Sequence, residues 1–286
     1  MAPEGLRRLG AVVQYDGSRF HGFQLQGEMR TVQLVLERAL EKVTGRRVRV
    51  LASGRTDAGV HALGQVVSFD TDVELAREKW VPALNAWLPE DVSITQVFDA
   101  PLGFHPRFSA CSKTYVYVIY EGEVRSPFLR SYTYHYRGKL DSKLMKLEAK
   151  ALEGEHDFAA FCATGSSVRS TVRRVFSAEL CELPVNAGRL LILKMEANGF
   201  LYNMVRICAG TLLEVGRGRL PTGTVRRCLE TGRREDAGET LPAQGVWLLG
   251  VRYDFLDTAG WVNYNDFCRL ITGGQEVCGN AHDIYG

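Results

Sequence analysis

Short apolar runs and stretches of helical spacing alternate along the first hundred residues. Apolar runs bounded by turn residues predict strands, and apolar residues recurring every three or four positions predict helices. One helix is well marked, because Thr31 can cap its start and Gly45 suits its end. The expected order is β-α-β-β-α-β, with elements at residues 9–15, 32–43, 48–52, 66–70, 75–87 and 92–98.

This order is that of the split βαβ, ferredoxin-like unit, and it predicts an α+β domain over residues 1–104. A second α+β half is expected over residues 105–255. Its predicted strands are 114–120, 132–136, 172–183, 190–197 and 246–253, and its predicted helices are 142–152 and 200–215. The expected fold class is therefore α+β, with two ferredoxin-like or RNP-like halves whose antiparallel sheets lie side by side around a central RNA-binding cleft.

Residues 256–286 show no clear periodicity and form a C-terminal extension of unassigned role. The extension either packs on the protein surface or forms a contact between subunits, and both alternatives are kept.

Hydrophobic residues make up 45% of the whole chain and charged residues 24%, as in ordinary globular proteins. No apolar stretch approaches the roughly 20 residues that a membrane span needs, and the N-terminus lacks a secretory signal. We therefore expect a cytoplasmic protein with no membrane partner.

Charge and cysteine content bear on the possible partner and on the kinds of site that the chain can form. The net charge of +2 gives weak support for a polyanionic partner, but 27 of the 35 basic residues are arginine. Arginine binds phosphate bidentately and stacks on bases, which suits RNA, although genomic base composition produces the same bias. The seven cysteines are scattered without a Cys-x-x-Cys pair, which argues against a disulfide framework and against a zinc site.

The segment GRTDAGVHA, residues 54–62, is the most informative loop. Its glycines allow a tight turn between two strands, which holds Asp57 and Arg55 outward at a strand end. A carboxylate fixed in this way suits catalysis. The same residues are also common turn formers, with the aspartate bonding its own backbone.

All nine positions of this loop together resemble the catalytic loop of the TruA class of tRNA pseudouridine synthases. Five further blocks resemble that family in the same order, and coverage extends from about residue 9 to residue 255. They are YDG at 15–17 with HGFQLQ at 21–26, KTYVY at 113–117, GEHDF at 154–158 with Phe161, TVRRV at 171–175 and GFLYNMVR at 199–206.

The resemblance implies an isomerase that converts uridine to pseudouridine at positions 38, 39 and 40 of the tRNA anticodon stem-loop. It implies a homodimer that binds tRNA, without organic cofactor or metal. By the family's pattern Asp57 is the nucleophile, Tyr115 lies against the target base and Arg206 pairs with Asp57. Arg55 occupies or guards the gap left by the flipped nucleotide, and Val246 stands where the family more often has leucine against the uracil.

The chemistry agrees with these roles. A carboxylate can attack as a nucleophile or stabilise positive charge on the sugar, and the isomerisation needs no redox change or group donor. Burial raises a carboxyl pKa and an adjacent arginine lowers it, so Arg206 is expected to keep Asp57 charged. Tyr115 can stack on the uracil with its hydroxyl near the departing C5 proton, while Tyr117 shares its sheet face. Whether Asp57 attacks C1′, attacks the base or acts through loss of a C2′ proton stays open.

Several polar residues on loops are candidates for RNA contacts along the cleft: Arg19, His21, Gln24, Gln26 and Arg173. His61 is interpreted as a residue that holds the loop through a hydrogen bond. Three alternatives are kept: an inactive RNA-binding protein of the same fold, the same chemistry on other RNA uridines, and a hydrolase that pairs Asp57 with Asp16.

Overall fold

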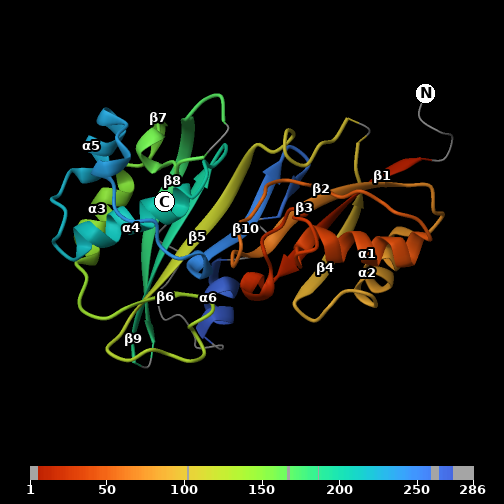
Figure 1. The fold of residues 1–286 in the computed structure, drawn as a ribbon, viewed down its shortest axis with the longest axis horizontal. Coiled ribbons are helices and arrows are strands. Elements are labelled where there is room, and N and C mark those ends of the chain that lie inside the picture. Colours follow the sequence, from red (N-terminus) through yellow and green to blue (C-terminus); the bar gives the residue numbers. More distant parts are fainter. Residues whose placement is uncertain (1–5, 102, 166–167, 186, 259–263, 273–286) are drawn as a thin grey trace.

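The computed structural model describes residues 6–101, 103–165, 168–185, 187–258 and 264–272. In these residues the strands form a single sheet of eleven strands that runs through both halves of the chain (Figure 1). The main path of the sheet is β4-β1-β3-β10-β5-β9-β8-β7, with the short strands β2, β6 and β11 paired at its sides. The expected α+β class is confirmed. The strands of the two halves lie side by side, as expected, and pairing between them joins the two expected sheets into one continuous sheet.

The first half contains the predicted β-α-β-β-α-β order. Its elements are β1 (Arg7–Tyr15), a short 3-10 helix η1 (Gly17–Arg19), α1 (Val32–Thr44), β2 (Leu51–Ala52), β3 (His61–Thr71), α2 (Arg77–Asn85) and β4 (Val92–Asp99). Thr31 caps α1 by accepting a hydrogen bond from the Leu34 amide, and Gly45 ends it in the left-handed conformation, as predicted. The predicted strand 48–52 is shorter than expected, since pairing with β3 is confined to β2.

The second half adds long strands and a layer of helices. Its elements are β5 (Ser112–Glu121), β6 (Tyr134–Tyr136), α3 (Ser142–Lys150), β7 (Gly154–Asp157), η2 (Ala159–Phe161), β8 (Val172–Val185), β9 (Gly188–Ala197), α4 (Met204–Gly216), α5 (Thr224–Thr231), η3 (Arg234–Asp236), η4 (Ala243–Gly245), β10 (Val246–Tyr253), β11 (Leu256–Asp257) and α6 (Tyr264–Thr272). Helix α4 begins later than the predicted residue 200, because Asn203 takes a left-handed backbone conformation directly before it.

Strand β10 joins the two halves. It pairs in parallel with β3, where Trp247 lies opposite His61, and antiparallel with β5, where Leu248 lies opposite Tyr115. The last long strand of the chain is thus inserted between elements made much earlier. The predicted domain division at residues 104 and 105 stays a prediction, as does an independent role for residues 256–286, of which 259–263 and 273–286 lie outside the described residues.

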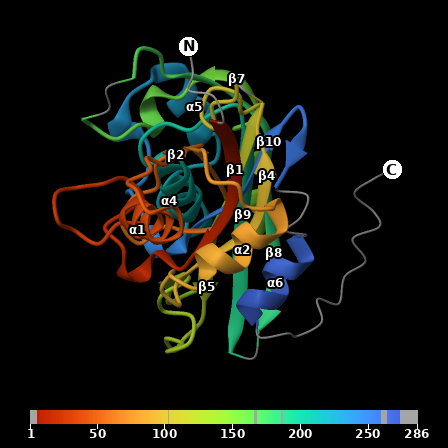
Figure 2. The same ribbon diagram turned by 90° about the vertical axis from the view of Figure 1, so that its right-hand side faces the viewer.

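Alternation along β5 separates two apolar cores on opposite faces of the sheet. Tyr115, Tyr117 and Ile119 belong to the larger core, which the main helices cover. Val116, Val118 and Tyr120 belong to a smaller core that includes residues of β10 and α6. Figure 2 shows α1 and α4 on one side of the sheet and α6 on the other.

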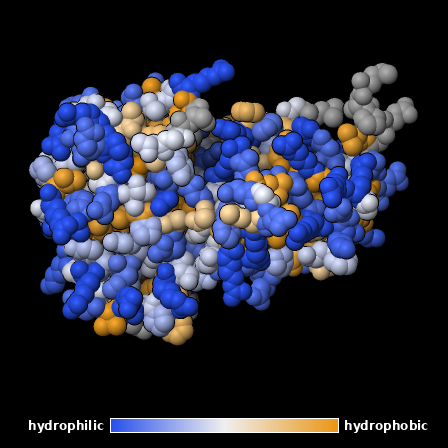
Figure 3. Space-filling model, viewed as in Figure 1, coloured by the Kyte–Doolittle hydropathy of each residue, from blue (hydrophilic) through white to orange (hydrophobic). Residues whose placement is uncertain are grey.

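One face of the molecule is mostly polar. In the face shown in Figure 3, hydrophilic residues predominate over both halves and apolar patches are small. Among the described residues, no helix combines the length and apolar character that crossing a membrane requires.

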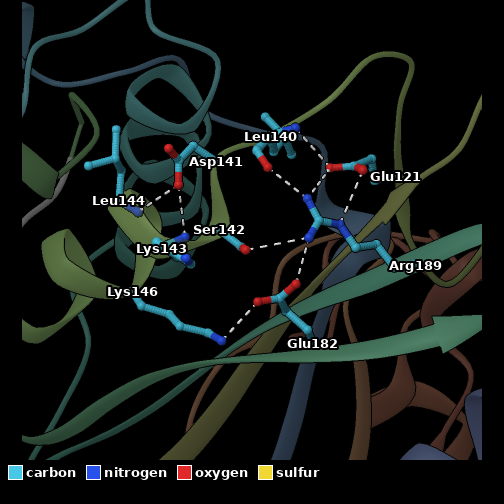
Figure 4. Close-up of polar contacts among 9 residues, drawn as sticks. All are labelled: Glu121, Leu140, Asp141, Ser142, Lys143, Leu144, Lys146, Glu182 and Arg189. Carbon is cyan, nitrogen blue, oxygen red and sulfur yellow. Dashed lines mark hydrogen bonds and ion pairs between the residues drawn. The ribbon is translucent and has the colours of Figure 1, made fainter.

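An arginine network fastens the helical layer of the second half to the sheet (Figure 4). Arg189 on β9 forms two hydrogen bonds with Glu121 on β5, at 2.9 and 3.1 Å, and one of 2.6 Å with Glu182 on β8. It also donates to the Leu140 carbonyl at 2.7 Å, just before α3, whose N-cap is Asp141. A single guanidinium therefore ties three strands to the start of a helix.

Candidate active site

The loop that carries Asp57 lies between β2 and β3 and is held at its centre by neighbouring backbone and side chains. The Tyr15 hydroxyl and the Thr56 hydroxyl lie 2.8 Å apart in a buried hydrogen bond. The Phe23 amide donates to the Thr56 carbonyl at 3.0 Å. Gly22 allows this approach, because it has a positive φ of 83° and a Cβ there would lie 2.7 Å from the Thr56 carbonyl oxygen. The YDG and HGFQLQ blocks therefore position the loop that carries Asp57.

A second group of contacts fixes the start of the same loop. Gln65 on β3 donates to the Gly54 carbonyl at 3.0 Å and accepts from the Ser53 hydroxyl at 2.5 Å. The ammonium of Lys113 on β5 donates to the Ser53 carbonyl at 2.5 Å. Burial, together with the smaller effect of the nearby Arg107 charge, lowers the pKa of Lys113 to about 8. Sequence reasoning did not single out Lys113, although it opens the KTYVY block.

Arg206 reaches the loop from the first turn of α4. Its Nη1 lies 3.7 Å from Oδ2 of Asp57, within ion-pair distance. Two other groups orient the guanidinium: the Leu241 carbonyl accepts from Nε at 2.6 Å, and the Asn203 side-chain oxygen accepts from Nη1 at 2.6 Å. Asn203 has a φ of 59°, a conformation that asparagine tolerates better than most residues.

The pKa of Asp57 is raised above its ordinary value. Burial is the larger cause, and the charge of Arg206 opposes it. The expected opposition of the two effects is present, and burial has the larger effect because Arg206 lies 3.7 Å from Asp57 without a direct hydrogen bond. The side chain of Asp57 remains 37% exposed, so it is open to a substrate.

Tyr115 and Tyr117 point to the same sheet face but have different surroundings. Tyr115 lines the cavity beside Asp57, and its ring packs edge-on against Phe200 with centroids 4.9 Å apart. The Tyr117 hydroxyl donates to the Pro242 carbonyl at 2.8 Å and is therefore occupied. Burial raises the pKa of Tyr115 above its ordinary value, so its phenol keeps its proton.

These groups meet in one cavity of about 650 Å³. Its walls come from both halves of the chain and include six residues singled out from the sequence: Asp57, Arg55, Gln24, Tyr115, Arg206 and Val246. Among the described residues, no group of three or more His, Cys, Asp or Glu side chains is placed to hold a metal ion. The cavity instead combines one carboxylate with several cations, a tyrosine and apolar side chains.

Four other candidates for RNA contacts are not among the residues that line this cavity. Arg19 is exposed and lies 3.8 Å from Glu90. Gln26 donates to the His21 carbonyl at 3.1 Å, within the exposed loop before α1. Arg173 on β8 donates to the carbonyls of its own segment, at 2.6 and 2.9 Å. The structure therefore places them outside the pocket itself, and RNA contact by them stays a prediction.

His61 has a structural position, as the sequence interpretation had it. Its ring is fully buried and stacks on Trp247 with centroids 4.3 Å apart. The Gly17 amide donates to Nδ1 at 3.1 Å, and Nε2 lies 3.0 Å from the Ser131 carbonyl. His61 thus anchors the end of the Asp57 loop.

Asp16 lies elsewhere. It lines a second cavity, of about 930 Å³, with Tyr120, Tyr132 and Trp247. Tyr120 and Trp247 belong to the opposite face of the sheet from Tyr115 and Val246. A hydrolase that pairs Asp16 with Asp57 is therefore ruled out as a reading of this site, because the two carboxylates do not share a cavity.

Comparison with known proteins agrees with the geometry. The chain matches the tRNA pseudouridine synthase family over residues 11–109 and 149–254. It is 45% identical over 249 residues to tRNA pseudouridine synthase A of Geobacillus sp. (strain WCH70), covering 87% of this chain and 99% of that protein. The same enzyme of Anoxybacillus flavithermus (strain DSM 21510 / WK1) is 45% identical over 250 residues, covering 87% of this chain and all of the relative.

Among solved structures, an archaeal box H/ACA sRNP Nop10–Cbf5 complex shows a distant likeness. Its sequence identity is 14% and its TM-score 0.32, over 71% of this chain and 53% of that one. This likeness adds nothing to the assignment. The family match covers more than half of the chain and includes Asp57, Arg206 and Val246, and on that basis the chain belongs to the tRNA pseudouridine synthase family, whose members are isomerases.

Proposed function

We propose that the protein converts uridine to pseudouridine at positions 38, 39 and 40 of the tRNA anticodon stem-loop, with Asp57 as the nucleophile. The observation that carries this proposal is the Asp57 carboxylate, which lies 3.7 Å from Arg206 in a cavity that Tyr115 also lines. The TruA resemblance supports the target positions, and the relatives are named for tRNA.

The residues divide the reaction between them. Asp57 attacks the extruded nucleotide, the bond between N1 and C1′ breaks, and the base turns while it stays enclosed. C5 then bonds to C1′ as the bond to Asp57 breaks, C5 loses a proton and N1 gains one, so the product is an isomer and no donor or acceptor of electrons is consumed. Arg206 holds Asp57 in its charged form by opposing the effect of burial on the pKa.

The other cavity residues bind and orient the base. Tyr115 presents its ring to the uracil and its neutral phenol to C5, while Val246 forms an apolar wall. Arg55 carries a cation at the cavity wall and is assigned to the space that the extruded base leaves in the RNA stack. Arg19, His21, Gln26 and Arg173 are assigned to contacts with more distant parts of the tRNA, and Gln24 to an RNA contact at the cavity wall.

Incubation of the protein with an unmodified tRNA transcript tests this function. Pseudouridine is mapped position by position for the parent, for Asp57→Ala and for Asp72→Ala as a control. Asp72 is an exposed carboxylate that pairs with Arg46 and does not line the cavity. We expect pseudouridine in the anticodon arm with the parent and the control and none with Asp57→Ala.

Two outcomes would favour the alternative functions, an inactive RNA-binding protein or the same reaction at other uridines. Tight tRNA binding by the parent without any pseudouridine would indicate an RNA-binding protein that has lost turnover. Pseudouridine outside positions 38 to 40 would keep the chemistry and change the target. A homodimer is also proposed, on the resemblance alone, and sedimentation of the purified protein measures it.

A further inference from the structure

An aromatic side chain stands exposed at the wall of the Asp57 cavity. Phe108 lines that cavity and is 77% exposed. A phenyl ring left in water forfeits the free energy that burial would provide, so an exposed ring at a binding cavity indicates a surface completed by a ligand. The roles proposed above do not use this ring.

The ring is held in place by its own turn. The Ser109 amide donates to the His105 carbonyl at 2.9 Å, and the Ser109 hydroxyl accepts from the His105 amide at 3.1 Å. The Arg107 amide donates to Nδ1 of His105 at 3.1 Å. His105 packs against the Phe108 ring with centroids 4.4 Å apart. One side of the phenyl ring is thus supported.

Deeper contacts anchor the turn to the sheet. The Tyr253 hydroxyl, on β10, donates to the Pro106 carbonyl at 2.8 Å. Phe104 is buried against Tyr253 and Phe255, with centroids 5.1 and 5.5 Å apart. Because the turn is fixed before any ligand arrives, stacking on Phe108 costs little conformational entropy.

The charges around the ring select an anion. The guanidinium of Arg107 lies 5.7 Å from the centre of the Phe108 ring. Arg107 is also close enough to Lys113 and to Arg173 to lower the pKa of each. Among the described residues, neither Arg107 nor Lys113 forms an ion pair with a carboxylate. A phosphodiester satisfies such cations, and an unpaired base satisfies the ring.

We infer that Phe108 is a stacking platform for a second unpaired base of the RNA, next to the extruded uridine, with Arg107 and Lys113 holding the phosphate between the two nucleotides. The inference rests on the proposed function and deepens it, since it assigns to the cavity a flanking nucleotide as well as the reacting one. It makes Phe108 a positioning residue, because the ring does not touch the reacting atoms.

The test compares Phe108→Ala and Phe108→Trp with Phe128→Ala. Phe128 is a matched control, because it is 85% exposed and lines the cavity on the other face. Steady-state kinetics use unmodified tRNA. Phe108→Ala is expected to raise KM about tenfold, the usual effect of losing one stacked base, with kcat changed less than about threefold. Phe108→Trp retains a flat ring and is expected to keep a KM near that of the parent.

A second measurement is independent of turnover. In the Asp57→Ala background, an anticodon stem-loop RNA carries 2-aminopurine at one loop position after another, and its fluorescence falls when that base stacks on an aromatic ring. We expect quenching at one position beside the target, lost in Phe108→Ala and retained in Phe108→Trp and Phe128→Ala. If the parent makes no pseudouridine but this pattern appears, the platform stands and the proposed reaction fails.

Three results would overturn the inference. Unchanged KM and unchanged quenching in Phe108→Ala would show that the ring does not stack on RNA. Equal effects of Phe108→Ala and Phe128→Ala would show a general loss of surface hydrophobicity. A change of sedimentation coefficient in Phe108→Ala at equal concentration, without RNA, would make the ring a subunit contact.

Discussion

Two arginines of this molecule are held in very different ways. Arg189 forms hydrogen bonds with two carboxylates, at distances between 2.6 and 3.1 Å, and with a carbonyl. Arg206 is oriented by a carbonyl and an amide oxygen, and the one carboxylate that it pairs with, among the described residues, lies 3.7 Å away. Both side chains are largely buried, at 29% and 20% exposure.

The difference separates a structural network from a reactive one. The carboxylates around Arg189 are satisfied, and this contact raises the pKa of the guanidinium, so the network stabilises the fold. Asp57 has a raised pKa, because Arg206 offsets the effect of its burial only in part. A carboxylate that protein contacts leave incompletely stabilised retains the capacity to bond to a substrate.

Removal of the reactive arginine is expected to have the largest effect. Arg206→Ala takes away the charge that lowers the pKa of Asp57, so that pKa rises further. We expect kcat to fall on the order of 100-fold, as for loss of one preorganised charged contact. In the proposed reaction Asp57 attacks in its ionised form, so the acidic limb of the pH–rate profile should move to higher pH. Arg137→Ala, which removes an exposed arginine paired with Glu123, is the control, and an unshifted acidic limb would contradict the coupling.

Removal of the structural arginine is expected to lower stability and spare the chemistry. Arg189→Met leaves Glu121, 13% exposed, without its cationic partner. We expect the free energy of unfolding to fall by about 2–3 kcal/mol, somewhat less than for a fully buried pair, with kcat unchanged. Denaturant unfolding measures the loss. The double variant Glu121→Gln/Arg189→Met should recover part of it, and equal loss in both variants would indicate packing instead of charge.

Neutralising Asp57 is expected to give the smallest effect. It should raise stability, whereas Arg189→Met lowers it. Its pKa is raised in the folded state, so the folded protein retains this proton to higher pH than the unfolded chain. Stability from this group is present at low pH and is lost as pH rises through the folded pKa. Asp57→Asn removes the charge, so Tm at pH 8 should rise by up to about 2 °C, with a gap that narrows toward pH 4. A lower Tm at pH 8 would show that Arg206 outweighs burial.

Local patterns were sufficient for much of the fold. The cap at Thr31, the end at Gly45 and the strands of each half followed from apolar spacing and turn residues. The segment 264–272 was expected to lack periodicity, yet α6 forms and places Phe267 and Ile271 in the smaller core. Their four-residue spacing is a helical signal that the expectation missed, and Phe267 packs edge-on against Trp247 of β10.

The site shows the same division. Asp57, Arg55, Tyr115 and Val246 were named from motifs, and the fold brings them into one cavity. Lys113 and Phe108 were missed. From sequence alone a lysine is expected to be a surface charge, and a phenylalanine is expected to lie in the core. Their significance depends on burial and exposure, which arise only when both halves of the chain meet.

The place of β10 also sets when this protein acquires its site during synthesis. Ribosomes release the strands of each half in turn, and those can pair among themselves as they emerge. Val246–Tyr253 emerges after them and is inserted between β3 and β5. In a nascent chain that ends before Val246, Asp57 and Arg206 lie in two halves that β10 does not yet join. We expect such chains to be unable to react with RNA, so that the proposed reaction becomes possible only after Val246–Tyr253 has joined the sheet.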